Sequence, residues 1–118
     1  MNSDSDNIFI GHFLPEGILE YFDVSGVRDL EGRIEVHLTE KNMHPVEYQK
    51  DKLTSKGFFE PVTVQDFPIR GKASYLKIKR RRWLNETRGL VVYRNWDLVA
   101  NGTRLTKEFA AFLKAMVG

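Results

Sequence analysis

Cysteine is absent from the 118-residue chain, which excludes disulfide bonds, thiolate nucleophiles and thiolate metal sites. Long apolar runs are also absent, so no segment has the length needed to span a bilayer as a helix. The first ten residues, MNSDSDNIFI, are acidic and polar and lack the basic and apolar regions of a signal peptide. These absences lead us to expect a cytoplasmic protein that does not contact a membrane.

Histidine is scarce, and the carboxylates are scattered along the chain. His12, His37 and His44 are far apart in the sequence, which makes a metal site an unfavourable interpretation in a chain without cysteine. No two carboxylates share an apolar setting that would separate their pKa values, and there is no Gly-rich phosphate loop or nucleophile elbow. We therefore expect no catalytic residues, no cofactor and no metal in this chain.

Charge is present in abundance but is distributed unevenly. The formal net charge is +2, whereas residues 1–69 carry −7, residues 70–88 carry +7 and residues 89–118 carry +2. A strongly basic segment thus sits on an acidic body. Such an asymmetry indicates a localised electrostatic surface for an anionic partner.

Hydrophobic periodicity predicts one α+β domain over residues 9–118, preceded by a disordered polar tail over residues 1–8. An apolar face that recurs at helical spacing predicts a short helix over Pro15–Phe22, with the proline in its first turn. A closing helix is predicted after Thr106, which is a suitable N-cap for the segment TKEFAAFLKAM. These two helices are expected to flank an antiparallel sheet.

Alternating apolar and polar residues predict the strands of that sheet. The segment VSGVRDLEGRIEVHLTEK reads as strand, turn and strand, with the turn at Glu31-Gly32. Residues 40–58 are polar without a clear period and predict a long loop with a helical turn near residues 46–50. After these come the breaker-rich turn DFPIRGK, the turn NETRG and three strands of a predicted meander, residues 61–66, 73–83 and 90–96.

The stretch SYLKIKRRRW, residues 74–83, is the most distinctive feature of the chain. On a strand, successive side chains alternate between faces, so Tyr75, Lys77 and Trp83 share one face with two further cations, Lys79 and Arg81. The opposite face begins apolar and ends in cations. We therefore expect the end of this hairpin to project out of the domain, because buried unpaired cations are unfavourable. The residues on this opposite face are Ser74, Leu76, Ile78, Arg80 and Arg82.

Cations and aromatic rings at strand spacing suit a nucleic acid. Lysine and arginine can follow phosphates, arginine can read guanine edges in a major groove, and an aromatic ring can stack on a base or wedge into a groove. A tryptophan or tyrosine on this strand can also brace the hairpin. The candidate nucleic-acid-binding residues are Arg70, Lys72, Tyr75, Lys77, Lys79, Arg80, Arg81, Arg82, Trp83 and Arg88.

Three other interpretations of the basic stretch stay open at this point. It can be a solvated edge strand, in which lysine prevents aggregation, or a surface that docks on an acidic protein partner. It can also bind RNA or a single strand, because aromatic rings alternate with cations. Five cations over residues 77–82 exceed what edge protection needs, which favours a binding role.

Residues 62–94, VTVQDFPIRGKASYLKIKRRRWL…TRGLVVYR, resemble the N-terminal region of bacterial insertion-sequence transposases. In zinc-ribbon members of that family, a similar turn and alternating strand ending in Arg-Arg lead into a Cys-x-x-Cys knuckle. The segments LPEGILEYFDV and LTKEFAAFL extend the resemblance over most of residues 13–113. The positions that fit the pattern are Asp66, Pro68, Gly71, Leu76, Ile78, Arg81 and Arg82.

This resemblance implies recognition of transposon-end DNA by a module encoded apart from its catalytic subunit. The chain departs from the family in having no cysteine, so it implies a zinc-ribbon-like hairpin without zinc. In this family the reaction is performed by a separate Asp-Asp-Glu (DDE) domain, which the chain is too short to include. The implied partners are transposon-end DNA, a DDE catalytic subunit and, as a further candidate, a second copy of the chain.

Overall fold

The computed structural model describes residues 11–96, 109, 111 and 113, and these residues form mostly β-structure. The described strands are β1 (Phe22–Leu30), β2 (Arg33–Glu40), β3 (Leu53–Phe58), β4 (Val62–Ile69), β5 (Lys72–Lys79), β6 (Arg81–Asn85) and β7 (Leu90–Val92). Two short 3-10 helices accompany them, η1 (Ile18–Glu20) and η2 (Val46–Tyr48).

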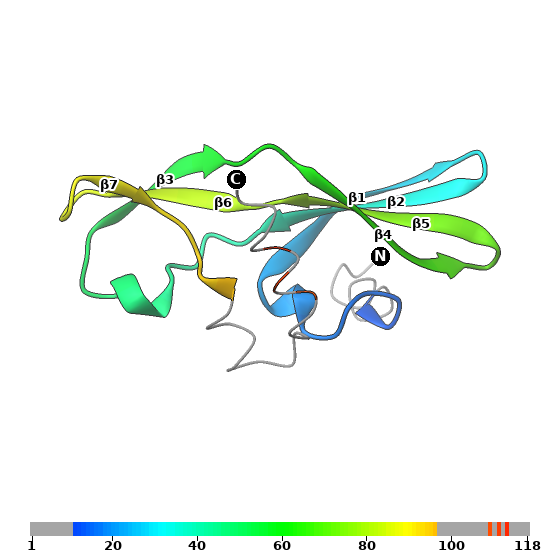
Figure 1. Cartoon of the computed structure of the whole chain (residues 1–118), viewed down its shortest axis with the longest axis horizontal. Coiled ribbons are helices and arrows are strands. Elements are labelled where there is room, and N and C mark those ends of the chain that lie inside the picture. Colours follow the sequence, from blue (N-terminus) through cyan, green and yellow to red (C-terminus); the bar gives the residue numbers. More distant parts are fainter. Residues whose placement is uncertain (1–10, 97–108, 110, 112, 114–118) are drawn as a thin grey trace, which may run out of the picture.

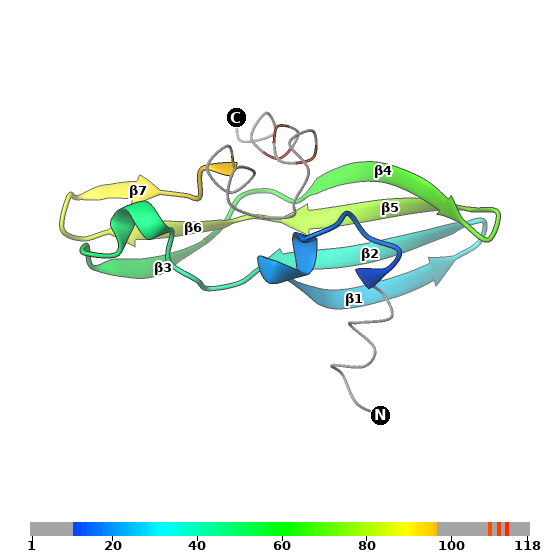
Figure 2. The ribbon, with the colours of Figure 1, turned by 90° about the horizontal axis from the view of Figure 1, so that it is seen from below.

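The strands form two sheets that lie end to end (Figure 1). The larger sheet, sheet A, has the order β1-β2-β5-β4, and the smaller, sheet B, has the order β3-β6-β7 (Figure 2). Only Arg80 separates β5 from β6, so one nearly continuous extended segment runs from one sheet into the other. The resulting shape is elongated, with a radius of gyration of 15.1 Å against about 13 Å for a compact chain of this length.

Sheet A combines two antiparallel hairpins that meet along a parallel seam. β1 pairs with β2 and β4 pairs with β5, while β2 and β5 run parallel over residues 33–39 and 73–79. One face of this sheet carries the main apolar core. There Ile18 of η1 and Phe22 pack with the inward side chains of β2 and β5 and with Trp96, which stacks on Phe22 at 5.4 Å. The opposite face carries no described element (Figure 1).

The predicted α+β fold with flanking helices is wrong, because the described residues are mostly strand and none of the helices among them reaches seven residues. In place of a helix over Pro15–Phe22 the chain forms η1, and β1 already begins at Phe22. Gly17 explains this difference, since it adopts φ 86°, a left-handed conformation that stops an α-helix from starting at the proline. The predicted closing helix after Thr106 falls largely outside the described residues, of which Phe109, Ala111 and Leu113 lie in this segment.

The predicted three-stranded meander is also wrong. The predicted strand 73–83 is divided into β5 and β6, which belong to different sheets. As a result β4 pairs only with β5 and β7 only with β6, so the zinc-ribbon-like arrangement expected for this hairpin does not form. The neighbour of β5 on its other side is β2, and a long-range parallel pairing of this kind leaves no local signal in the sequence.

Residues 40–58 hold a strand that periodicity did not reveal. Their helical turn is confirmed as η2, but residues 53–58 form β3 rather than loop. Most of β3 is exposed on both faces, and a bulge around Gly57, at φ 83°, breaks its register with β6. Alternation appears in a sequence only when one face is buried, which explains why this strand was missed.

The hairpin predictions fare better than the helix predictions. The strands on either side of Glu31-Gly32 are confirmed as β1 and β2, and NETRG is confirmed as the turn between β6 and β7. The breaker-rich segment DFPIRGK is largely strand, because β4 continues to Ile69 and the turn consists only of Arg70 and Gly71. The tail predicted over residues 1–8 lies outside the described residues.

Candidate nucleic-acid interface

The ten candidate residues divide into two groups, because their strand is interrupted at the junction of the two sheets. The first group lies on β5 and on the turn before it and comprises Arg70, Lys72, Tyr75, Lys77 and Lys79. The second lies on or beside β6 and comprises Arg80, Arg81, Arg82, Trp83 and Arg88. The structure gives the two groups different environments.

Burial along this segment changes phase at the junction. Alternate side chains of β5 are buried up to Arg80, and the next buried side chains are those of Trp83 and Asn85. On a regular strand every second side chain faces inward, but Trp83 comes three positions after Arg80. The inward-facing positions therefore shift by one residue at the junction. The predicted alternation, which placed Trp83 on the face of Lys77, is therefore wrong beyond β5.

The ring of Phe58 contacts two cations at this junction. Lys79 Nζ lies 4.8 Å from the centre of the Phe58 ring, and Arg81 Cζ lies 4.6 Å from it. Arg81 also donates from Nη1 to the hydroxyl of Ser55 at 2.8 Å and from Nε to the main-chain oxygen of Glu40 at 3.2 Å. These contacts fix the Arg81 guanidinium against sheet B.

The Phe59 ring contacts the other two cations of residues 79–82, the segment that we call the basic run. The guanidinium carbons of Arg80 and Arg82 lie 5.2 Å and 5.3 Å from the centre of its ring. Arg80 is only 2% exposed and donates from Nη1 to the main-chain oxygen of Leu113 at 3.0 Å. Burial lowers the pKa of Arg80 from its ordinary value, and the nearby Glu40 opposes that shift. The expectation that Arg80 projects from a hairpin tip is wrong, because it lies inside the junction.

A buried carboxylate ties this junction to both sheets. Glu40, at the end of β2, accepts a hydrogen bond at Oε1 from the main-chain NH of Arg81 at 2.9 Å and one at Oε2 from Nε of Arg94 at 3.0 Å. Arg94 also donates to the main-chain oxygen of Met43. Burial raises the pKa of Glu40 above its ordinary value, although both arginines act in the opposite direction.

Trp83 is fully buried in the core of sheet B with Leu53 and Val92. Its Nε1 donates to Oδ1 of Asn42 at 2.9 Å, and the ring meets His44 edge-on at 6.3 Å between centres. The indole thus has both its apolar surface and its polar atom satisfied within the protein. Of the roles considered from the sequence, this position agrees with bracing the hairpin rather than with stacking on a base.

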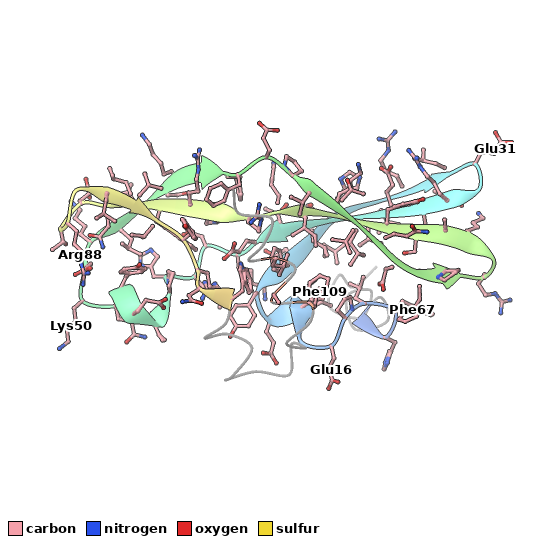
Figure 3. All side chains as sticks on the ribbon, viewed as in Figure 1. Glu16, Glu31, Lys50, Phe67, Arg88 and Phe109 are labelled. Carbon is pink, nitrogen blue, oxygen red and sulfur yellow. The ribbon has the colours of Figure 1, made fainter. Side chains whose placement is uncertain are left out.

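Arg88 lies in the turn between β6 and β7 at the far end of sheet B (Figure 3). Its Nε pairs with Oδ2 of Asp51 at 2.9 Å, and its guanidinium lies 5.8 Å from the centre of the Tyr48 ring. The buried Asn85 donates to the same Asp51 oxygen at 2.8 Å and accepts from the main-chain NH of Arg88 at 3.0 Å. The turn is therefore anchored to the segment before β3.

The first group, on β5 and the turn before it, contains the cations that are accessible to a partner. Tyr75, Lys77 and Lys79 project from the face of β5 opposite the core, where no described element covers sheet A (Figure 1). Lys77 makes no hydrogen bond or ion pair within the described residues, and Lys79 is exposed with only its cation–π contact. Beside them, the guanidinium of Arg33 lies 5.9 Å from the centre of the Tyr75 ring.

Arg70 and Lys72 occupy the end of the β4–β5 hairpin. Arg70 is exposed and makes no ion pair within the part of the chain that the structure describes. Lys72 Nζ pairs with Oδ1 of Asp29 at 2.9 Å, which joins the ends of the two hairpins of sheet A. The hairpin end therefore carries one free guanidinium and one engaged ammonium.

Two features were not predicted from the sequence. One is the pair Phe58 and Phe59, whose rings contact the cations of residues 79–82, and the other is the exposed ring of Phe67 on β4. Phe58 is the last residue of the segment predicted as a loop, residues 40–58, and Phe59 follows it directly. Their adjacency was the available signal, because neighbouring residues of a strand serve opposite faces and can receive alternate residues of a partner strand.

Comparison with known proteins adds no constraint to this geometry. No family model, no curated protein and no solved structure matches the chain. Among the described residues, no three histidine or acidic side chains come together as a metal site would require. Nor does the described part of the chain contain a helix that is long and apolar enough to cross a membrane.

Proposed function

We propose that the chain is a non-catalytic DNA-binding module, the N-terminal region of a transposase, which recognises transposon-end DNA. The observation that carries the proposal is the uncovered face of β5, on which Lys77 and Lys79 stand beside Tyr75. A separate DDE catalytic subunit forms part of the same proposal on the strength of the sequence resemblance, and a cytoplasmic setting on the strength of the sequence features described first.

The arrangement of charges on this face suits a polyanion. Glu35 is buried there and pairs with Arg33 at 3.0 Å and with His37 at 3.3 Å, so its charge is already compensated within the protein. Lys77 and Lys79, two residues apart on one strand, lie roughly 7 Å apart along it. Ammonium groups in such a row can neutralise phosphates and release their counterions.

The β4–β5 ribbon supplies the shape for a duplex. β4 is an edge strand of sheet A, so the ribbon it forms with β5 can be approached from the side. Ribbons and sheets of β-strands can bind a duplex in either the major or the minor groove. Arg70 at its end and Lys77 within it would contact the backbone on either side of the groove. The proposed contact residues are thus Arg70, Tyr75, Lys77 and Lys79, with Lys72 beside them.

Two other partners would use the same cations. An acidic surface of a catalytic subunit would dock on them without any preference for a DNA sequence, and an unpaired strand would stack a base on Tyr75. Arg80, Arg81, Arg82, Trp83 and Arg88 take a supporting part in each case, since they hold the sheet junction and the distal turn.

A mobility-shift titration of the purified chain tests the proposal. The probes are a random duplex, a single strand and the inverted repeats that flank the gene, each at two salt concentrations. Tighter binding to the repeats, weakened by salt, is the expected result. Preference for the single strand would favour the stacking alternative, and absence of binding to every probe would overturn direct recognition of nucleic acid.

A further inference from the structure

Phe67 is the most exposed large apolar side chain of the described residues, at 84%, while the next, Val46, reaches 60%. A phenylalanine left in water forgoes the stabilisation that burial would give it, which makes the position informative. Its ring lies near the end of the β4–β5 hairpin, on the side of sheet A that faces η1 (Figure 3). There Phe67 lines a cavity of about 580 Å³ together with Phe13 and Pro15. These neighbours leave most of the Phe67 ring exposed.

A β-bulge directs this ring away from the sheet. Asp66 pairs with Ser74 and Ile69 pairs with Lys72, so Phe67 and Pro68 on β4 oppose the single residue 73 on β5. A bulge of this kind changes the direction of a side chain and ends regular pairing. The following proline stiffens the segment and lacks the NH that a further ladder bond would need.

The turn beside Phe67 retains a strained arginine. Arg70 is the only residue other than glycine with a positive φ among the described residues, at 54°, and Gly71 follows at 80°. A two-residue turn with two positive φ angles favours asparagine or glycine at its first position. Asparagine or glycine would adopt this backbone conformation with less strain than arginine. The strained Arg70 therefore indicates that the guanidinium has a function at the exposed turn.

The end of this hairpin is also held in place. The ion pair between Lys72 and Asp29 joins it to the β1–β2 hairpin, and the main-chain NH of residue 73 donates to the oxygen of Gly32 at 3.3 Å. An apolar ring and a free guanidinium therefore stand three residues apart on a supported ribbon.

From these features we propose that Phe67 is a DNA-bending wedge, which inserts between two base pairs while Arg70 holds an adjacent phosphate. This inference rests on the proposed function and deepens it by naming the substrate as a duplex with an easily unstacked step. Proteins that bend DNA insert apolar side chains between base steps from the minor groove, and pyrimidine–purine steps unstack most readily. Lys77 and Lys79 project from the face of β5 opposite to the side on which Phe67 lies, so the wedge contact is made by the end of the hairpin, with Phe67 and Arg70.

The test uses a 30-base-pair A·T-rich duplex with a central TA step. One version carries donor and acceptor dyes at its ends to report bending, and the other carries 2-aminopurine at the TA step to report unstacking. The full chain is compared with F67A, with F67L as the conservative variant and with V46A as a control that removes an exposed apolar group from η2. Circular dichroism and thermal unfolding verify the fold of each variant.

The wild-type chain and V46A are expected to raise energy transfer and to increase 2-aminopurine fluorescence several-fold. F67A should lose at least half of both signals while its affinity falls less than tenfold, and F67L should retain most of them. Wild-type signals from F67A would overturn the wedge while leaving the DNA-binding proposal intact, and would assign the ring, with Phe13, to a protein-docking surface. Failure of the wild-type chain to bind would overturn both.

Discussion

Arg94 Nε lies 3.0 Å from Oε2 of Glu40, and both side chains are almost completely buried. This pair connects the end of β2 in sheet A with the segment that follows β7 in sheet B, across the point where the basic run passes between them. A buried pair of this kind holds its partners in a fixed arrangement, because either charge alone would be strongly unfavourable there. Two of the cations that the sequence suggested for DNA, Arg80 and Arg81, make hydrogen bonds within the protein at this same junction.

The buried position of Glu40 gives a pH-dependent contribution to stability. Because burial raises the pKa of folded Glu40 above its ordinary 4.5, the folded state binds more protons than the unfolded state above that pH. The contribution of Glu40 is complete below pH 4.5 and is lost as the pH rises through its folded pKa. The free energy of unfolding of wild type minus that of E40Q should therefore fall from pH 4 upward, as measured by urea unfolding.

Glu86 supplies a control of the opposite sign. A hydrogen bond from Thr54 and the nearby ammonium of Lys52 lower the pKa of this exposed carboxyl. Its contribution is present above the ordinary pKa and is lost as the pH falls, so the difference between wild type and E86Q should rise with pH. A wild-type minus E40Q difference that rises in the same way would contradict the assigned direction for Glu40.

Arg81 and Lys77 should separate folding from binding. R81A removes the hydrogen bonds to Ser55 and to the Glu40 main chain together with the contact to Phe58, and should lower the free energy of unfolding by about 2 kcal/mol. K77A removes no hydrogen bond or ion pair within the described residues and should change the free energy of unfolding by less than about 0.5 kcal/mol. Chemical denaturation measures both. Equal stability of the two variants would show that the junction contacts contribute little.

Local signals in the sequence were sufficient to predict the β1–β2 hairpin but not how the strands pair into two sheets. The turn at Glu31-Gly32 and the alternation of Ile34, Val36 and Leu38 identified β1 and β2, because one face of β2 packs on the core. The parallel pairing of β2 with β5 and the division of the basic strand depend on residues distant in the sequence. Neither has a periodic signature, so the continuous run of residues 73–83 appeared to be one strand.

The basic segment could be found from composition, but which of its cations have partners within the protein could not. Composition showed a cluster of cations without showing which of them had partners. Phe58 and Phe59, 21 to 23 residues earlier in the sequence, and Glu40, about 40 residues earlier, decide that question by contacting residues 79–82. Of the candidate cations before residue 80, Arg70 and Lys79 are exposed, and Lys77 makes no hydrogen bond or ion pair within the described residues.

Salt dependence should count the phosphate contacts of the open face. If Lys77 and Lys79 each neutralise one phosphate of B-DNA, the slope of log K against log salt should become less steep by about 1.8 in K77A/K79A. The change should be uniform across duplex sequences, since phosphate contacts carry no sequence information. Fluorescence anisotropy at four or more salt concentrations measures the slope.

K50A is the matched control for that experiment. Lys50 lies at the opposite end of the molecule from the β4–β5 turn, is exposed, and makes no ion pair within the described residues (Figure 3). Its removal lowers the net charge without touching the proposed interface, so the slope should remain that of wild type. An equal change in K50A and in the double variant, corrected for the number of charges, would indicate a general charge effect instead of a defined surface.

Arg70 offers a test in which stability and binding move in opposite directions. Asparagine tolerates the positive φ that the β4–β5 turn requires, so R70N should raise the free energy of unfolding by about 0.5–1 kcal/mol. The same change removes the free guanidinium at the hairpin end, so it should weaken duplex binding and reduce the salt slope by about 0.9. E31N, in the β1–β2 turn, is the control, because Glu31 has no positive φ and carries no cation. It should bring no such stabilisation and no loss of binding, whereas an R70N variant that is more stable and binds DNA as tightly as wild type would exclude Arg70 from the interface.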